Sequence, residues 1–539
     1  MRALLLFSAL ASAAEIRSVT VDASKVIGPL RNLQGSNGCN TTATAALPIP
    51  LHDLQEPLAR LWPSHGIQHV MIYTWPDVFL GWGLSGTAGD ATRPENYNWT
   101  DADATVRFIL DHGAVASVQF NPDAGMNATL SSAALLGDIG FMIADRYMNG
   151  AHGAGFHNAL DLIDFYPEED LYAARNADYE TSFAYFAGFA RGVARANSSL
   201  GVGAWGSNRI WTPQTNYTLT DPFITQFYQD CAEQKVPIKA ATYHFTNAQY
   251  SFDPYDIKRL TDAFRRNVLV PAGLSSLPVW VTEFDGNPGG ALPTSASALA
   301  SYNDPAWFAS FNLAVSMYAQ DADGLEQALP WTGFGYGGYG AGNASFPAWF
   351  NETDGEPVPL NAAAAWRLQA DLVVNASSRL EVRGSSPDGF AVLAGRSATA
   401  DEVQVLLNNY QLDYDIPRQI AAVMAPELNT STTADPIIQS NGLLNGEQAC
   451  LLPGTAAVIP VCQTFLEATV RNNTSQGYQL NITNLPWDAT TSYEVQIARV
   501  GGGQVYHVVQ EAIGSGNSFE ITLDLPGNAQ DLVKIRKAK

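Results

Sequence analysis

Cysteine and basic residues are both scarce in this chain of 539 residues. Four cysteines are too few for a disulfide scaffold, and neither a CxxC nor an HExxH motif is present to indicate a metal site. The 29 Lys and Arg residues stand against 52 Asp and Glu, a formal net charge of −23. This balance argues against nucleic acid or an anionic membrane surface as a partner. We expect no metal and no other cofactor.

Long hydrophobic runs are also missing, since no stretch reaches the roughly 20 apolar residues that cross a membrane. The N-terminal MRALLLFSALASAAEI has one Arg, a short apolar stretch and a small-residue pattern. These features are typical of a secretory signal peptide, here residues 1–14. A dozen Asn-X-Ser/Thr sequons, Asn40, Asn98 and Asn343 among them, fit a glycoprotein. The predicted location is extracellular.

What the chain does contain, between about residues 28 and 375, is an alternation of short apolar runs with amphipathic helical stretches. The eight candidate strands are LRNLQGSNG, HVMIYTW, AVASVQFN, LDLIDFYPE, VGAWGS, AATYHF, PVWVTEF and QALPWTGFG. The clearest helical patterns are TDADATVRFILDHG, YETSFAYFAGFARGVARA, PFITQFYQDCAEQ and AAAAWRLQADLV. Eight strand-then-helix units predict an α/β fold, a (β/α)₈ TIM barrel with its active site at the C-terminal ends of the strands.

Residues 376–539 follow a different pattern of short alternating strands separated by turns, which predicts an accessory antiparallel β-sandwich. Its candidate strands are RLEVRG, GFAVLAGR, EVQVLLNNY, TFLEATVR, GYQLNIT, SYEVQIARV and SFEITLDL. Residues 15–27 alternate in the same way, so this N-terminal strand is expected to join the sandwich.

The four cysteines are expected to behave differently from one another. Cys450 and Cys462 flank LLPGTAAVIPV and are expected to form a disulfide, which would stabilise the fold by about 3 kcal/mol. Cys39 follows the first barrel strand at the catalytic face, whereas Cys231 falls late in a helix near the opposite end. These two are expected to stay unpaired, because a disulfide needs Cα atoms within about 7 Å.

The C-terminal ends of the barrel strands carry a set of residues suited to sugar chemistry. Hydrolysis of a glycoside needs two carboxyls across the scissile bond, and Glu168 and Glu283 end strands four and seven, on opposite sides of the ring. Aromatic faces stack on sugar rings, and polar side chains bind hydroxyls. The candidate substrate-binding residues are Tyr73, Asn121, Trp205, His244, Trp331 and Phe334.

Several of these residues also have a purely structural interpretation. Glu168 begins the acidic run Glu-Glu-Asp, which is favourable wherever a helix starts. His244 could be a hydrogen-bonded histidine of the barrel, the commoner role of a lone His. Trp205 and Trp331 could pack the barrel rim. The strand context and the presence of a partner carboxylate favour catalysis for Glu168 and Glu283.

Five phrases, in order, resemble glycoside hydrolase family 39, a clan A family of retaining enzymes with a (β/α)₈ barrel and a β-sandwich. They are YNWTDADATVRFILDHGAVASVQFNP, IDFYPEEDLY, FYQDCAEQKVPIKAATYHFTN, LPVWVTEF and VPLNAAAAWRLQADL. The second sits where the family writes Trp-Asn-Glu-Pro-Asp, which implies that Glu168 is the acid/base. The third places the family's strand-six His at His244, and the fourth implies that Glu283 is the nucleophile.

The sequence departs from the family around these carboxylates. The Asn that precedes the acid/base Glu is Pro167, and an Arg-Phe-His on strand two is replaced by Met71, Ile72 and Tyr73. Thr246 stands where clan members often carry a Tyr that binds the nucleophile. Two functions therefore compete: a secreted retaining glycosidase that removes terminal sugars from a plant or microbial oligo- or polysaccharide, and a catalytically impaired carbohydrate-binding protein. The retained carboxylate pair favours the enzyme.

Overall fold

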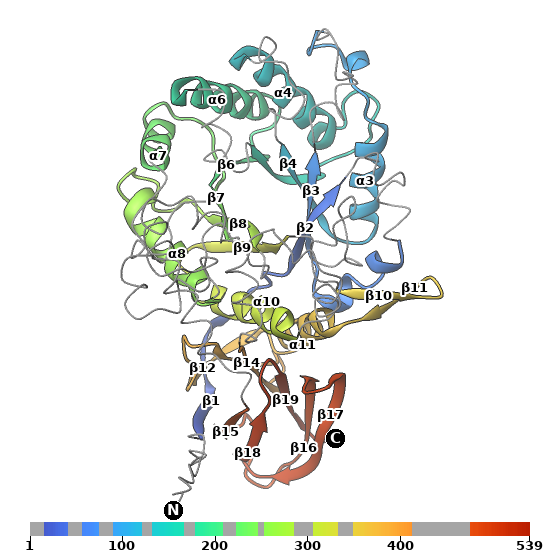
Figure 1. Ribbon diagram of the computed structural model, residues 1–539, viewed down its shortest axis with the longest axis vertical. Helices are drawn as coiled ribbons and strands as arrows, with labels where there is room; N and C mark the ends of the chain where they lie inside the picture. Colours follow the sequence, from blue (N-terminus) through green and yellow to red (C-terminus); the bar gives the residue numbers. More distant parts are fainter. Residues whose placement is uncertain are drawn as a thin grey trace, which may run out of the picture.

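The described part of the chain forms an eight-stranded parallel sheet, a nine-stranded sheet and a small hairpin (Figure 1). The computed structural model describes residues 16–40, 56–74, 90–120, 132–165, 178–207, 223–245, 253–284, 306–331, 349–411 and 475–538. Within these residues no helix is both long and apolar enough to span a membrane.

The eight-stranded sheet is the predicted barrel. Its strands are β2 (Gly35–Asn40), β3 (His69–Thr74), β4 (Val115–Phe120), β5 (Leu160–Phe165), β6 (Gly201–Ser207), β7 (Ala240–Phe245), β8 (Val279–Phe284) and β9 (Leu325–Pro330). Each pairs in parallel with the next in chain order. A parallel bridge between Asn37 and Trp331 joins the end of β9 to β2 and closes the ring.

Helices surround the barrel, as Figure 1 shows. They are α3 (Thr100–Asp111), α4 (Ala133–Asn149), α6 (Tyr179–Ala196), α7 (Ile224–Glu233), α8 (Asp256–Phe264), α10 (Ala306–Ala319) and α11 (Asn361–Asn375), with short turns η1 (Pro63–His65), η2 (Pro94–Asn96) and the π-helical η6 (Arg265–Leu269). The predicted helical patterns correspond to α3, α6, α7 and α11; α4, α8 and α10 were not among them. Side-chain caps begin two of these helices, since Ser132 accepts from Leu135 N and Asp178 from Thr181 N.

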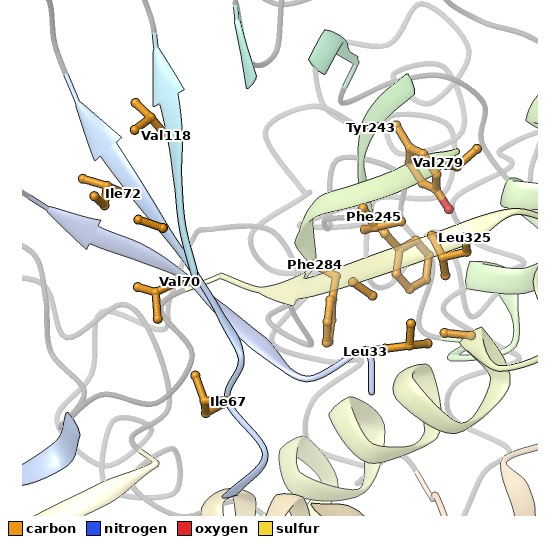
Figure 2. Packing of buried hydrophobic residues seen from close by; sticks show 14 of the residues in the cluster. Leu33, Ile67, Val70, Ile72, Val118, Tyr243, Phe245, Val279, Phe284 and Leu325 are labelled. Atoms are coloured by element: carbon orange, nitrogen blue, oxygen red, sulfur yellow. The ribbon is translucent and has the colours of Figure 1, made fainter. Parts of the chain in front are cut away.

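Alternation along the barrel strands sorts side chains into two cores. On β8, Val279, Val281 and Phe284 pack outward in the large cluster under the helices, and Figure 2 shows Val279 and Phe284 beside Tyr243, Phe245 and Leu325. Trp280 instead points inward, where it packs with Met71, Leu162, Ala240 and Leu329. This apolar plug fills the barrel interior toward the N-terminal ends of the strands. The polar residues of the candidate site lie on its other side, toward the C-terminal ends.

The nine-stranded sheet is mostly antiparallel, as predicted. In spatial order it runs β17 (Gln504–Ser515), β16 (Ser492–Gly501), β19 (Gln530–Lys537), β14 (Glu402–Asn409), β13 (Phe390–Arg396), β12 (Ser378–Arg383), β1 (Arg17–Pro29), β15 (Gln476–Thr483) and β18 (Phe519–Leu525). β1 pairs with β12 antiparallel but with β15 in parallel. β17, β19 and the hairpin β10 (Phe350–Thr353) to β11 (Glu356–Pro359) were not predicted, and the expected strand at 464–471 lies outside the described residues.

The two ends of this sheet face each other across a shared apolar core. Tyr478 on β15 donates to Asp531 Oδ2 on β19 at 2.9 Å, and the rings of Tyr493 on β16 and Phe519 on β18 lie 6.5 Å apart. The sheet therefore folds over itself as a sandwich. In Figure 1, α10 and α11 lie between this sheet and the barrel.

Candidate active site

Glu283 reaches the barrel interior because β8 departs from strict alternation. Val279 and Val281 point outward, so an unbroken strand would send Glu283 outward as well. The pairing shifts register between Tyr243 and His244 on one side of β8, and between Val281 and Phe284 on the other. Such an irregularity re-aims a side chain. The Glu283 side chain is 8% exposed and contacts residues of β4 and β7 inside the ring.

Two neighbouring strands hold the Glu283 carboxylate. Gln119 on β4 donates from Nε2 to Glu283 Oε1 at 2.7 Å. His244 on β7 places Nδ1 3.5 Å from Glu283 Oε2. The same Gln119 Nε2 lies 3.3 Å from His244 Nε2. Each carboxylate oxygen thus faces a nitrogen from a different strand, which fixes the rotation of the group.

The orientation of Gln119 follows from Asn37 at the end of β2. Asn37 Nδ2 donates to Gln119 Oε1 at 3.1 Å and to the carbonyl of Thr282 at 2.6 Å. The carbonyl end of the Gln119 side chain therefore faces Asn37, and its amide end faces Glu283 and His244. Because that amide is a donor, His244 Nε2 is the acceptor and Nδ1 carries the proton toward Glu283.

A second carboxyl, Asp164 on β5, lies in the interior and is fully buried. Thr242 on β7 and Asp164 Oδ1 are hydrogen-bonded at 2.7 Å. Burial raises the pKa of Asp164, although the neighbouring His244, Thr242, Thr282 and Gln119 oppose that rise. The interior above the apolar plug is therefore a polar layer with contributions from β2, β4, β5, β7 and β8.

The structure brings Glu283 and His244 together and separates Trp205 from them. Trp205 is buried with its ring 4.4 Å from Phe227 on α7 and 6.1 Å from Tyr179 on α6, in the layer between barrel and helices. Trp331 is half-buried beside the site, and its backbone N–H donates to the carbonyl of Phe284 at 2.7 Å.

For several predicted site residues the structure does not describe the side chain. Tyr73 lies on β3, where its backbone pairs with Asn40 and Gln119, but its side chain is outside the description. Glu168, Asn121, Phe334, Cys450 and Cys462 lie outside the described residues. The chain is described up to Phe165 at the end of β5, three residues before Glu168.

Cys231 on α7 is a free, buried thiol, and burial raises its pKa. No group of His, Cys, Asp and Glu side chains suited to a metal ion occurs among the described residues. The sequence did not single out Gln119, Asp164 or Thr242. A signal was nonetheless present, because amide, carboxyl and hydroxyl side chains at inward positions of barrel strands must find partners inside the ring.

Comparison with known proteins establishes the fold. No family model matches the chain, and no curated protein matches it significantly. Among solved structures, a glucosidase from Croceicoccus marinus is similar over 97% of this chain and 100% of its own, with 18% identity and a TM-score of 0.68.

A family 39 glycoside hydrolase from Xanthomonas axonopodis pv. citri matches over 97% of this chain and 98% of its own, with 15% identity and a TM-score of 0.60. A bacterial orthologue of human α-L-iduronidase matches over 97% of this chain and 84% of its own, with 12% identity and a TM-score of 0.61. The resemblance to family 39 noted in the sequence thus extends to the fold of nearly the whole chain, a barrel and sandwich shared with glycoside hydrolases.

Proposed function

We propose that this protein is a secreted, divergent family 39 glycosidase that removes terminal sugars from a plant or microbial oligo- or polysaccharide with retention of configuration. One observation carries the proposal: a carboxylate, Glu283, is turned into the barrel by an irregular strand and held there by Gln119 and His244. A rigidly held carboxylate at the C-terminal end of a barrel strand is suited to attack on an anomeric carbon.

In the proposed reaction Glu283 bonds to the anomeric carbon as the glycosidic C–O bond breaks, and Glu168 gives its proton to the leaving oxygen. Glu168 then takes a proton from water, whose oxygen displaces Glu283 from the sugar. The stereochemical outcome depends on the two carboxyls standing about 5–5.5 Å apart, as in retaining enzymes. The position of Glu168 just after β5, three strands from β8 in the ring, supports this pairing.

A signal peptide and the sequons support secretion, and flat aromatic residues near the strand ends support a sugar ligand. A panel of nitrophenyl glycosides, followed by plant and fungal glycans, would find the substrate. Proton NMR of the first-formed anomer would then test retention. An inverted product would contradict the role of Glu283 as nucleophile.

Two variants separate the roles of the carboxylates. Glu168→Ala should keep much of its first-step rate on a dinitrophenyl glycoside, because an activated leaving group departs without a proton. It should accumulate glycosyl-enzyme and be rescued by azide to the retained glycosyl azide. Glu283→Ala should lose several orders of magnitude on every substrate, because the covalent route is gone. Azide should rescue it only to the inverted product.

The opposite stereochemistry in the two rescue products would mean that the roles are exchanged. If both variants matched the wild type on every glycoside that it cleaves, the pair would not be catalytic. Sugar binding without any hydrolysis would support the carbohydrate-binding protein instead.

A further inference from the structure

The end of β6 has an unusual backbone that a side chain from β7 holds in place. Trp205 has a φ of 76° and Gly206 a φ of 42°, and the pairing with β7 shifts register between Ala204 and Ser207. A left-handed conformation is uncommon for a bulky residue. Thr242 Oγ1 accepts from Gly206 N at 3.0 Å and lies 3.1 Å from the carbonyl of Ala204. The Thr242 hydroxyl thus contacts the backbone on both sides of Trp205.

The third neighbour of this hydroxyl is Asp164 Oδ1 at 2.7 Å. A threonine hydroxyl has one hydrogen to donate. If Asp164 were ionised, Thr242 could donate to Asp164 or to Ala204 O, and the other contact would join two acceptors. If Asp164 carries a proton on Oδ1, it donates to Thr242, which in turn donates to Ala204 O. All three contacts are then hydrogen bonds.

The other oxygen of Asp164 gives an independent reason for the same protonation state. Asp164 Oδ2 is buried and makes no hydrogen bond of good geometry with a described residue, although Thr282 and Gln119 lie close enough to the carboxyl to favour its ionised form. An ionised oxygen without a donor is costly in the interior, whereas a neutral carbonyl oxygen costs far less. Two other buried aspartates among the described residues differ, since Asp256 is bonded to Arg259 and Asp531 to Arg499.

We propose that Asp164 is held as a neutral carboxylic acid that donates to Thr242, a positioning residue beneath Glu283 that braces β5, β6 and β7. If Asp164 is neutral, the negative charge of the site lies on Glu283. The importance of this charge for catalysis rests on the proposed function. The protonation state itself does not.

The groups that face Asp164 are mostly uncharged. β4 presents Gln119, and β6 presents Gly203, where an added Cβ would meet Asp164 Oδ1 at 3.0 Å. β7 presents Thr242 and His244, and β8 presents Thr282 and Glu283. His244 is the nearby group whose positive form would favour ionised Asp164. Its contact with Gln119 Nε2 needs the neutral ring.

The test compares urea unfolding of wild type and Asp164→Asn as a function of pH. A carboxyl with a raised pKa in the folded state stabilises the fold below its unfolded pKa, about 3.9. That stabilisation is lost as pH rises toward the folded pKa, by about tenfold in the folded-to-unfolded ratio per pH unit. The asparagine does not titrate and can still donate to Thr242. The free energy of unfolding of Asp164→Asn, measured relative to that of wild type, should therefore increase as the pH rises above about 4.

Asp531→Asn is the matched control, because it removes a buried carboxyl that is bonded to an arginine. Its free energy of unfolding relative to wild type should not increase with pH. A relative free energy of unfolding for Asp164→Asn that stays flat or moves the opposite way would overturn the proposal. If that variant does not fold, carbon-13 NMR of wild type with labelled Asp carboxyls decides. One protonated Asp signal at neutral pH supports the proposal, and none refutes it.

Neither readout needs a substrate, so failure here is distinct from failure of the proposed function. Where activity is found, the acidic limb of the pH–rate profile gives a further test. An ionised Asp164 would repel negative charge on Glu283, so its replacement by Asn would move that limb to lower pH. A neutral Asp164 predicts that the limb stays in place, whatever the change in kcat.

Discussion

At the scale of single residues, Gln119 is the side chain that connects the site. It receives a hydrogen bond from Asn37, gives one to Glu283 and lies within 3.3 Å of His244. Four strands of the barrel therefore meet at one amide. A neutral donor to a carboxylate holds the group in place without adding charge.

Replacing Gln119 by Leu should lower kcat/KM by about 10- to 100-fold, since a hydrogen bond to a charged group contributes about 1.5–3 kcal/mol. The control is Ser117→Ala, two residues earlier on β4, whose buried Oγ makes no hydrogen bond with a described residue. It should behave like wild type in the same assay. Equal activity of Gln119→Leu and wild type would show that the nucleophile does not depend on this amide.

The sequence could predict Glu283 and His244 but not the amide of Gln119 that links them. An apolar run that ends in a carboxylate is visible in LPVWVTEF, whereas the register shifts that turn Glu283 inward depend on pairing with β7 and β9. Gln119 in VASVQF reads as one polar residue in an otherwise ordinary strand. Its importance appears only when residues 82 and 164 positions away in sequence lie beside it.

At the scale of elements, α4 and α6 show how glycine sets the distance between two helices. A Cβ at Gly192 on α6 would lie 1.8 Å from the carbonyl oxygen of Gly137 on α4, and one at Gly188 would lie 2.2 Å from that of Ala133. Backbone contacts backbone along this pair. The helices can pack this closely only where side chains are absent.

We expect Gly192→Ala to destabilise the protein by about 1–3 kcal/mol, the usual cost of overpacking. In an isolated helix the same change would stabilise by about 1 kcal/mol, so the sign of the effect is diagnostic. Ala184→Gly, at an exposed position of α6, is the control and should cost only about 1 kcal/mol by helix propensity. Urea unfolding measures both. A stabilised Gly192→Ala would contradict the close packing.

Among the helices, α6 and α7 were predictable from the sequence and α10 was not. α6 and α7 show apolar residues at helical spacing because one face meets the barrel and the other meets solvent. α10, AWFASFNLAVSMYA, is buried at almost every position between barrel and sandwich, so its sequence has no polar face to reveal its period. The strand alternation of β12 to β14 was visible because each strand is short and bounded by turns.

At the scale of the whole molecule, the sandwich and the barrel share a core. On β13, Phe390, Val392 and Ala394 pack within the sandwich, while Ala391 and Leu393 belong to the cluster that contains the barrel. Ser310 on α10 and Asn408 on β14 exchange hydrogen bonds of 2.9 and 3.1 Å across the junction. Strands buried on both faces leave the two parts no independent surface, so we expect them to unfold together.

Asp371 on α11 gives this junction a pH dependence. It accepts hydrogen bonds from Lys534 on β19 and from Gln404 on β14, the latter at 3.0 Å. Burial alone would raise the pKa of Asp371, but the hydrogen bonds from Lys534, Asn375 and Gln404 prevail and lower it. A lowered folded pKa stabilises the fold above the unfolded pKa, about 3.9, and this contribution is lost as the pH falls from there.

Asp371→Asn should therefore be less stable than wild type at pH 7 by about 1–3 kcal/mol, the contribution of hydrogen bonds to a charged group. The difference should shrink as the pH drops below about 4, where the wild-type carboxyl takes up a proton. Urea unfolding followed by tryptophan fluorescence measures it, and Lys534→Met with the double variant completes a cycle that isolates the pair. The coupling should be present at neutral pH and vanish with acid. A coupling that persists at low pH would mean that Asp371 acts through packing.

The same urea unfolding of the wild type tests whether the sandwich and the barrel unfold together. Two separate transitions would show that they unfold independently, against the shared core described above.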